Sequence, residues 1–96
     1  MKRSDHLLWV LAEECNEVAH RCSKAARFNL NLTEPGHTLN NAERIIQEYQ
    51  DLIAAIEMLQ EDGLLPKEIS REAINAKKAK VEKYMILCID EFKTLE

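Results

Sequence analysis

Residues 7–22 read "LLWVLAEECNEVAHRC", and this stretch decides the fold class because its apolar residues recur at helical spacing. Each residue of an α-helix turns about 100° from the one before it. With Glu14 as the reference direction, five apolar side chains fall in one stripe about 60° wide. That stripe consists of Leu7, Leu11, Val18, Cys22 and Ala25. The stretch therefore predicts an amphipathic helix that packs along one side.

The first helix is expected to begin at Ser4 or Asp5, either of which can cap it, and to run to about Arg27. The segment "FNLNLTEPGHTLNN" follows at residues 28–41 and predicts a loop, because it contains Pro-Gly and four Asn. Asn or Ser before an apolar run is a typical helix cap, since its side chain accepts a backbone N–H bond.

Two further helices are expected beyond the loop. Asn40 or Asn41 can cap the second helix, which Gly63 would end. Pro66 suits the first turn of a third helix that runs to the end of the chain, with one possible break near Met85. No segment alternates with the period of a strand, so we expect an all-α protein of three to four helices.

Composition limits both the architecture and the classes of partner. Ninety-six residues predict one domain, residues 1–96, and so short a chain buries only a modest fraction of its surface unless it oligomerises. The net charge of −4 argues against binding a nucleic-acid polymer. No apolar run reaches membrane-spanning length, and Asp5 and His6 interrupt any signal peptide after "MKR". Three cysteines without paired spacing are expected to be reduced, mostly buried thiols in a cytoplasmic protein, with Cys15 in the core.

The acids of the first two predicted helices share one pattern. Glu14 lies at the edge of the apolar stripe, and Glu17 lies about 60° farther round, whereas Glu13 points toward solvent. On the second helix, Glu48 lies at the edge of the stripe formed by Ile45, Leu52, Ile56 and Leu59, and Asp51 lies about 60° away on the corresponding side.

One acid at a stripe edge is ordinary, because its carboxylate can reach outward to water. Two matching pairs on adjacent helices favour a different interpretation, since four unpaired carboxylates at a partly buried seam repel one another and resist desolvation. A hard divalent cation removes both costs. Mg²⁺ prefers oxygen ligands, often engages phosphate as well, and can be replaced by Mn²⁺. We therefore predict a Mg²⁺ site at Glu14, Glu17, Glu48 and Asp51.

The motifs "EECNE" and "EYQD" resemble the EExxE…ExxD signature of the MazG-like, all-α nucleoside triphosphate pyrophosphohydrolases. "SKAARF", "IEMLQEDGLL" and "AKKAKVEKYM" also resemble segments of short, single-domain and often phage-encoded members. The resemblance implies a helical bundle completed by oligomerisation, as a homodimer or homotetramer. It also implies Mg²⁺-dependent hydrolysis of a (deoxy)nucleoside triphosphate to monophosphate and pyrophosphate, in nucleotide-pool control or house-cleaning. About thirty residues separate the two motifs, at the upper end of the family's usual spacing.

Basic residues near the acids are candidates for contact with the substrate. Lys24 lies two turns after Glu17 on the same face and Arg27 one step round, so either is expected to receive a β- or γ-phosphate, while ordinary i,i+4 pairing with Glu17 is favoured for Arg21. The resemblance adds further candidates on the third helix. These are Asn75, Lys77 and Lys80.

No covalent nucleophile is needed for such a reaction. Glu13 and Glu17 are both candidates for the catalytic carboxylate that orients the attacking water, and the sequence does not choose between them. A non-enzymatic helical dimerisation or adaptor module is the first alternative. A di-iron carboxylate bundle is the second, and it is disfavoured because Glu17-x-x-His20 has no counterpart on the second helix.

Overall fold

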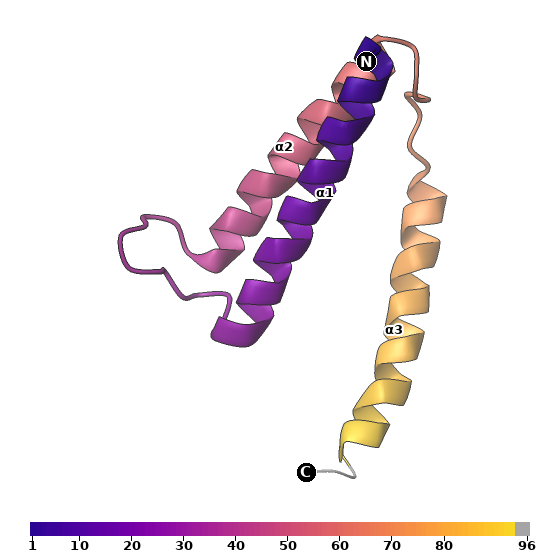
Figure 1. The fold of residues 1–96 in the computed structure, drawn as a ribbon. Helices are drawn as coiled ribbons and strands as arrows, with labels where there is room; N and C mark the ends of the chain where they lie inside the picture. Colours follow the sequence, from indigo (N-terminus) through magenta and orange to yellow (C-terminus); the bar gives the residue numbers. More distant parts are fainter. Residues whose placement is uncertain (94–96) are drawn as a thin grey trace. The chain divides into compact units, whose positions relative to one another are not determined.

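A computed structural model describes residues 1–93 of the chain, and within this range it contains three helices and no strand. The helices are α1 (Arg3–Phe28), α2 (Asn41–Glu61) and α3 (Arg71–Lys93) (Figure 1). The all-α prediction is thus confirmed. The chain divides into two compact units, Met1–Pro66, which contains α1 and α2, and Lys67–Glu96, which contains α3.

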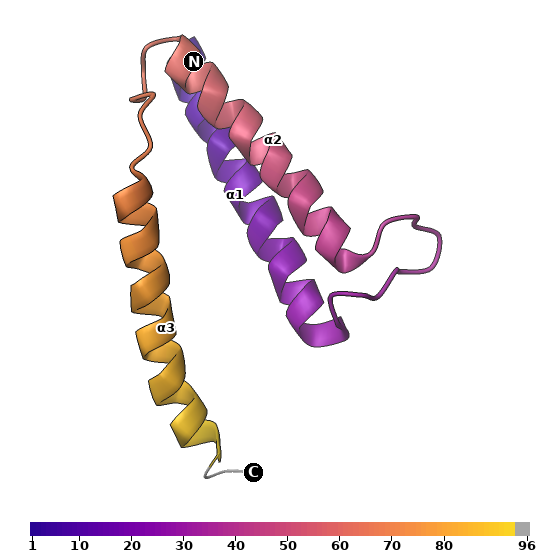
Figure 2. The ribbon, with the colours of Figure 1, turned by 180° about the vertical axis from the view of Figure 1, so that it is seen from behind.

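The first unit is an antiparallel helical hairpin. Figures 1 and 2 show α1 and α2 side by side from opposite directions, with the N-terminus beside the end of α2. An exposed ion pair shows which residues are level at this end, because Arg3 Nε lies 2.7 Å from Asp62 Oδ2. Since the two helices run in opposite directions, residues farther along α1 face residues progressively earlier in α2.

A narrow apolar seam holds the hairpin together. Its buried side chains are Leu7 and Ala25 of α1 and Ala55 and Leu59 of α2. Leu11 and Val18 of the predicted stripe are half-buried, as are Ile45, Leu52 and Ile56 of the second stripe. Burying one leucine side chain stabilises a fold by about 1.5–3 kcal/mol, so this small seam is a modest core for a 66-residue unit.

The observed helix ends agree only in part with those predicted from the sequence. Asn40 caps α2 as predicted: the backbone N–H of Glu43 donates to Asn40 Oδ1 at 2.8 Å, and the backbone N–H of Asn40 donates to Glu43 Oε1 at 3.0 Å. These reciprocal bonds form a capping box. Gly63, with a φ of 74°, follows the end of α2. The predicted caps of α1 are wrong, because that helix begins at Arg3, before both Ser4 and Asp5.

The loop between α1 and α2 is tied to both helices. Asn29, at a φ of 95°, ends α1 in the left-handed region that asparagine tolerates better than most residues. The backbone N–H groups of Asn41 and Ala42 donate to the carbonyls of Leu32 and Leu30 at 2.9 and 3.0 Å. The buried side chain of Asn41 donates from Nδ2 to the carbonyl of Asn29 at 2.8 Å. The loop is therefore closed by hydrogen bonds at its base.

The prediction that the cysteines are mostly buried is wrong, since Cys15, Cys22 and Cys88 are all exposed. Cys22, at the edge of the stripe predicted to pack, is therefore not part of the seam. With Cys15 it belongs to a second apolar stripe of α1, at about 80–160° from Glu14, that lies beyond the seam with α2. Its members are Leu8, Ala12, Cys15, Ala19, Cys22 and Ala26, all exposed. Because α2 covers only one side of α1, these side chains have no cover in the hairpin.

A matching stripe runs along α2 at the same offset from Glu48. Its members are Ala42, Ile46, Tyr49, Ile53 and Ile56, of which Ile46 and Tyr49 are exposed and the others half-buried. In an antiparallel pair whose seams face each other, equal offsets point to the same side of the hairpin. The two stripes therefore form one face without charged residues, here called the apolar face, opposite the side that carries Glu17 and Asp51.

The second unit is built on α3, which is continuous to Lys93 and shows no break near Met85. The expected start near Pro66 is wrong, because α3 begins at Arg71, where the backbone N–H of Ala73 donates to Ser70 Oγ at 3.0 Å. A serine hydroxyl in this position satisfies an otherwise unpaired amide of the first turn. Across residues 71–88 every side chain except the half-buried Ile74 is exposed. No helix within the described residues combines the length and apolarity needed to cross a bilayer.

Candidate metal centre

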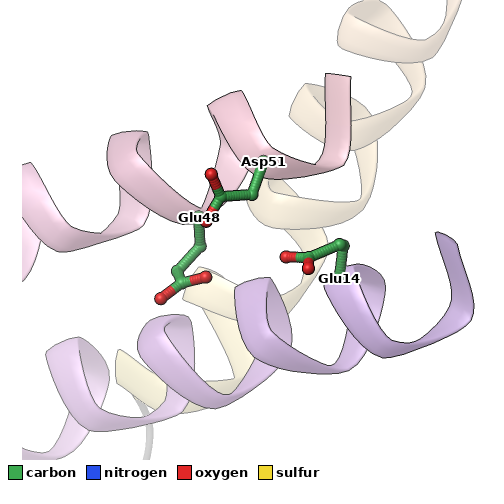
Figure 3. Close-up of side chains that lie close together, drawn as sticks. All are labelled: Glu14, Glu48 and Asp51. Carbon is green, nitrogen blue, oxygen red and sulfur yellow. The ribbon is translucent and has the colours of Figure 1, made fainter. Parts of the chain in front are cut away.

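Three of the four predicted ligands come together between α1 and α2. Each of Glu14, Glu48 and Asp51 offers a carboxylate oxygen, and these three oxygens lie within 4.8 Å of one another. Figure 3 shows the Glu14 side chain rising from α1 toward the Asp51 and Glu48 carboxylates of α2. We refer to these residues as the acidic triad.

The register of the hairpin explains this arrangement. Counting inward from the Arg3–Asp62 ion pair, eleven residues along α1 lead to Glu14 and eleven residues back along α2 lead to Asp51. These two side chains are therefore level with each other. Glu48 is three residues from Asp51, so the two carboxylates of α2 are neighbours on one helix surface.

Burial and charge act together on Glu14. Partial burial raises the pKa of the Glu14 carboxyl above its ordinary value, and the nearby Asp51, Glu48, Glu17 and Glu13 carboxylates raise the pKa further. Glu14 is half-buried, whereas Asp51 is exposed. The triad is therefore a partly covered patch of negative potential that opens to solvent on one side.

Glu17 and Glu13 lie beside the triad rather than within it. Both are exposed on α1, and both are close enough to raise the pKa of Glu14. Glu13 points to solvent as its angle predicts. Glu17 does not join the group of mutually close oxygens, so the four-carboxylate arrangement is present as three central acids with Glu17 at the edge.

The predicted substrate residues have different surroundings. Lys24 Nζ lies 3.5 Å from Glu34 Oε1, on the same side of the hairpin as the acids. The Arg27 guanidinium lies 5.0 Å from the centroid of the Phe28 ring, in a cation–π contact. Asn75, Lys77 and Lys80 belong to α3, and each is exposed there. Their contact with substrate stays a prediction.

Sequence reasoning missed a second cluster, centred on the loop residue Glu34. Besides Lys24, its carboxylate lies 3.3 Å from Arg44 Nη1 and 3.8 Å from His37 Nε2. Burial raises the pKa of Glu34, but Lys24 and Arg44 outweigh it and hold the pKa below its ordinary value. A signal was present in the sequence, because Arg44 lies one turn before Glu48, on the same side of α2 as Asp51.

Arg21 also differs from its expected role. Among the described residues no ion pair joins it to Glu17, and its Nε and Nη1 atoms are buried without a hydrogen-bond acceptor. Arg21 is seven residues after Glu14 on α1 and Arg44 is seven residues before Asp51 on α2, so the two arginines are level with each other across the seam. The cationic part of the hairpin therefore adjoins the acidic triad on its loop side.

No family model matches the chain, and no significant match was found among curated proteins or among solved structures. Among the described residues, the acidic triad is therefore the feature that bears most directly on function.

Proposed function

We propose that this protein is a MazG-like, Mg²⁺-dependent pyrophosphohydrolase that cleaves a (deoxy)nucleoside triphosphate between its α- and β-phosphates. The products are a nucleoside monophosphate and pyrophosphate, and the role is control or cleaning of the cytoplasmic nucleotide pool. The observation that carries the proposal is the acidic triad, whose three carboxylate oxygens lie within 4.8 Å of one another. The two motifs that supply the triad are those that resemble the family's signature.

The triad fits a hard divalent cation. Its donors are all carboxylate oxygens, the ligands that Mg²⁺ and Mn²⁺ prefer. Burial first, and the neighbouring carboxylates second, raise the pKa of Glu14, and a bound cation would offset both effects. When bound, Mg²⁺ neutralises phosphate oxygens and lowers the pKa of a bound water. Glu14, Glu48 and Asp51 would hold it, and Glu17 borders the same site.

The remaining residues supply positioning and proton transfer. Glu17 and Glu13 lie beside the triad, so either can accept a proton from an attacking water and orient it. Lys24 lies on the same side of the hairpin and offers positive charge to the leaving pyrophosphate. The hydrolysis requires no covalent intermediate, because water is the nucleophile throughout.

A nucleotide panel tests this proposal directly. The purified protein is incubated with each common dNTP and NTP and Mg²⁺, and monophosphate and pyrophosphate are quantified. Glu48→Gln is expected to lower the rate at least about a hundredfold, because it removes one charge from the triad while keeping the side chain's shape. Glu57→Gln, an exposed α2 position outside the triad, is the matched control. Intact nucleotides throughout, or equal rates for Glu48→Gln and wild type, would refute the proposal.

A purely structural role as a dimerisation module is the second candidate, and the apolar face favours it. We propose self-association of two copies through this face in either case. Small side chains dominate its α1 stripe, whereas its α2 stripe carries Ile46, Tyr49, Ile53 and Ile56. A two-fold axis would set the large stripe of one copy against the small stripe of the other. Because the side of the hairpin that carries Asp51 lies opposite the apolar face, association would leave both acidic triads outside the contact.

A further inference from the structure

The cationic cluster around Glu34 brings two cations, Lys24 and Arg44, and the His37 ring to a single carboxylate. Lys24, Arg44 and His37 all approach the same carboxylate, at 3.5, 3.3 and 3.8 Å. These are long contacts for charge-assisted hydrogen bonds, which are usually about 2.7–2.9 Å. Glu34 therefore sits between its partners without bonding any of them closely.

Arg21 and Arg44 add unused donors to the same region. Nε and Nη1 of Arg21 and Nη1 of Arg44 are buried, and none makes a well-formed hydrogen bond to any residue that the structure describes. Buried guanidinium donors without acceptors are unfavourable, because the desolvation cost is not recovered. Since Arg21 is level with Arg44 across the seam, a single multivalent acceptor can reach both helices.

The cluster also adjoins a pocket. An open cavity of about 340 Å³ is lined by Lys24 and Glu34 together with Phe28, Leu32 and Pro35. Glu34 enters it from the loop between α1 and α2, which is exposed over most of its length. A small rearrangement of the Glu34 side chain would free the lysine and arginine donors without moving either helix.

We propose that Arg21, Lys24 and Arg44 form a polyphosphate-binding site, and that Glu34 occupies it as an intramolecular substitute for phosphate in the free protein. A phosphate group has three or more acceptor oxygens and a higher charge than a carboxylate, so it uses donors that Glu34 leaves unpaired. Entry of the ligand displaces the Glu34 side chain toward solvent.

The site deepens the proposed function, and that connection rests on the function being correct. Arg44 is four residues, about 6 Å along the helix, before Glu48, on the same side of the hairpin as Asp51. A triphosphate whose α-phosphate lies at the acidic triad would then extend toward the loop, with its distal phosphates at the cationic cluster. The direction of the phosphate chain follows from this order of charges.

Binding of inorganic tripolyphosphate in EDTA tests the site without metal or catalysis. Calorimetry is expected to show binding to the wild-type protein, tightened about tenfold by Glu34→Gln, which removes the internal competitor. Lys24→Gln and Arg44→Gln are expected to weaken binding about tenfold or more. Glu57→Gln makes the same charge change as Glu34→Gln on a distant surface and should leave the affinity as in wild type.

The outcomes separate this inference from the proposed function. No tripolyphosphate binding, or equal affinities for Glu34→Gln and Glu57→Gln, overturns the site even if nucleotides are hydrolysed. Tripolyphosphate binding that responds to these substitutions supports the site even if no nucleotide is hydrolysed. Lys24 is half-exposed at the edge of the cluster, so Lys24→Gln keeps the test decisive should Arg44→Gln fail to fold.

Discussion

Glu14 is the residue on which burial and negative charge act together. Partial burial and four neighbouring carboxylates all raise its pKa, so its ionised form is less favourable in the folded chain than in the unfolded one. For an acid with a raised folded-state pKa, stability is greatest below the ordinary value of 4.5 and declines as the pH rises through the folded-state pKa. Near neutral pH, Glu14 therefore destabilises the protein until a cation or proton compensates it.

Glu14→Gln should consequently raise the melting temperature by a few degrees in EDTA at pH 7, with Glu57→Gln as the control. Circular dichroism melts at several pH values measure this, and the difference between wild type and Glu14→Gln should shrink as the pH is lowered. Added Mg²⁺ should stabilise wild type more than Glu14→Gln, because a ligand that binds only the folded state raises its stability. A lower melting temperature for Glu14→Gln in EDTA would contradict this account.

Glu34 should show the opposite pH dependence. Its pKa is lowered in the folded state, so the stability it contributes is present above the ordinary carboxyl value of 4.5 and is lost as the pH falls through its folded-state pKa. Acid titration followed by circular dichroism is expected to show a shallower loss of stability in Glu34→Gln than in wild type over this range. Identical acid limbs would show that Lys24 and Arg44 do not stabilise the Glu34 carboxylate.

The residue predictions from sequence succeed where direction around a helix is sufficient. Helical angles place Glu14 and Glu48 at the seam and Glu13 toward water, as the structure has them. Glu17 and Asp51 have the same offset, yet only Asp51 joins the triad. An angle fixes the direction of Cα–Cβ but not the rotamer of a long exposed side chain, and it carries no information on the register of the partner helix.

The helices differ in how clearly their sequences mark their ends. The start of α2 is predictable because Asn40 and Glu43 have the spacing of a capping box. The start of α1 is not, because its N-cap, Lys2, makes no side-chain capping bond. Pro66 is misleading for α3 because proline is compatible with both a first helical turn and an extended segment. The Ser70 hydroxyl, four residues beyond Pro66, caps α3 instead.

Asn40→Ala tests the capping box of α2. It removes the acceptor of the Glu43 amide and should lower the free energy of unfolding by about 1 kcal/mol. Urea denaturation followed at 222 nm measures the change. Asn40→Asp keeps a side-chain oxygen at the cap and is expected to retain most of the wild-type stability. Equal losses in both variants would mean that the side-chain oxygen of Asn40 is not what stabilises the start of α2.

For the whole molecule, the balance between buried and exposed apolar surface is the main constraint. The seam of the hairpin buries only four apolar side chains, whereas its apolar face leaves Leu8, Ile46 and Tyr49 exposed. The short chain and its apolar stripes predict that some apolar surface stays exposed in a single copy. The face itself could not be predicted, because a second stripe becomes apparent only when the seam is known to occupy the first.

Tyr49→Lys tests self-association through the apolar face. It places a charge within the proposed contact and is expected to shift the sedimentation coefficient of the protein from that of a dimer to that of a monomer. Gln50→Lys adds the same charge at the next exposed position of α2, outside the face, and should leave the dimer intact. A monomeric wild-type protein at tens of micromolar, or dimers with both variants, would argue against this contact.

The reactivity of the exposed cysteines of α1 can report on self-association of the chain. Cys15 and Cys22 both lie on the apolar face, two turns apart. A thiol reagent should therefore label them rapidly in dilute protein and slowly at concentrations where copies associate, with no substitution required. The same position carries a hazard, because oxidation could join two associated copies covalently. Protein prepared without reductant would then contain disulfide-linked dimers, which do not dissociate on dilution.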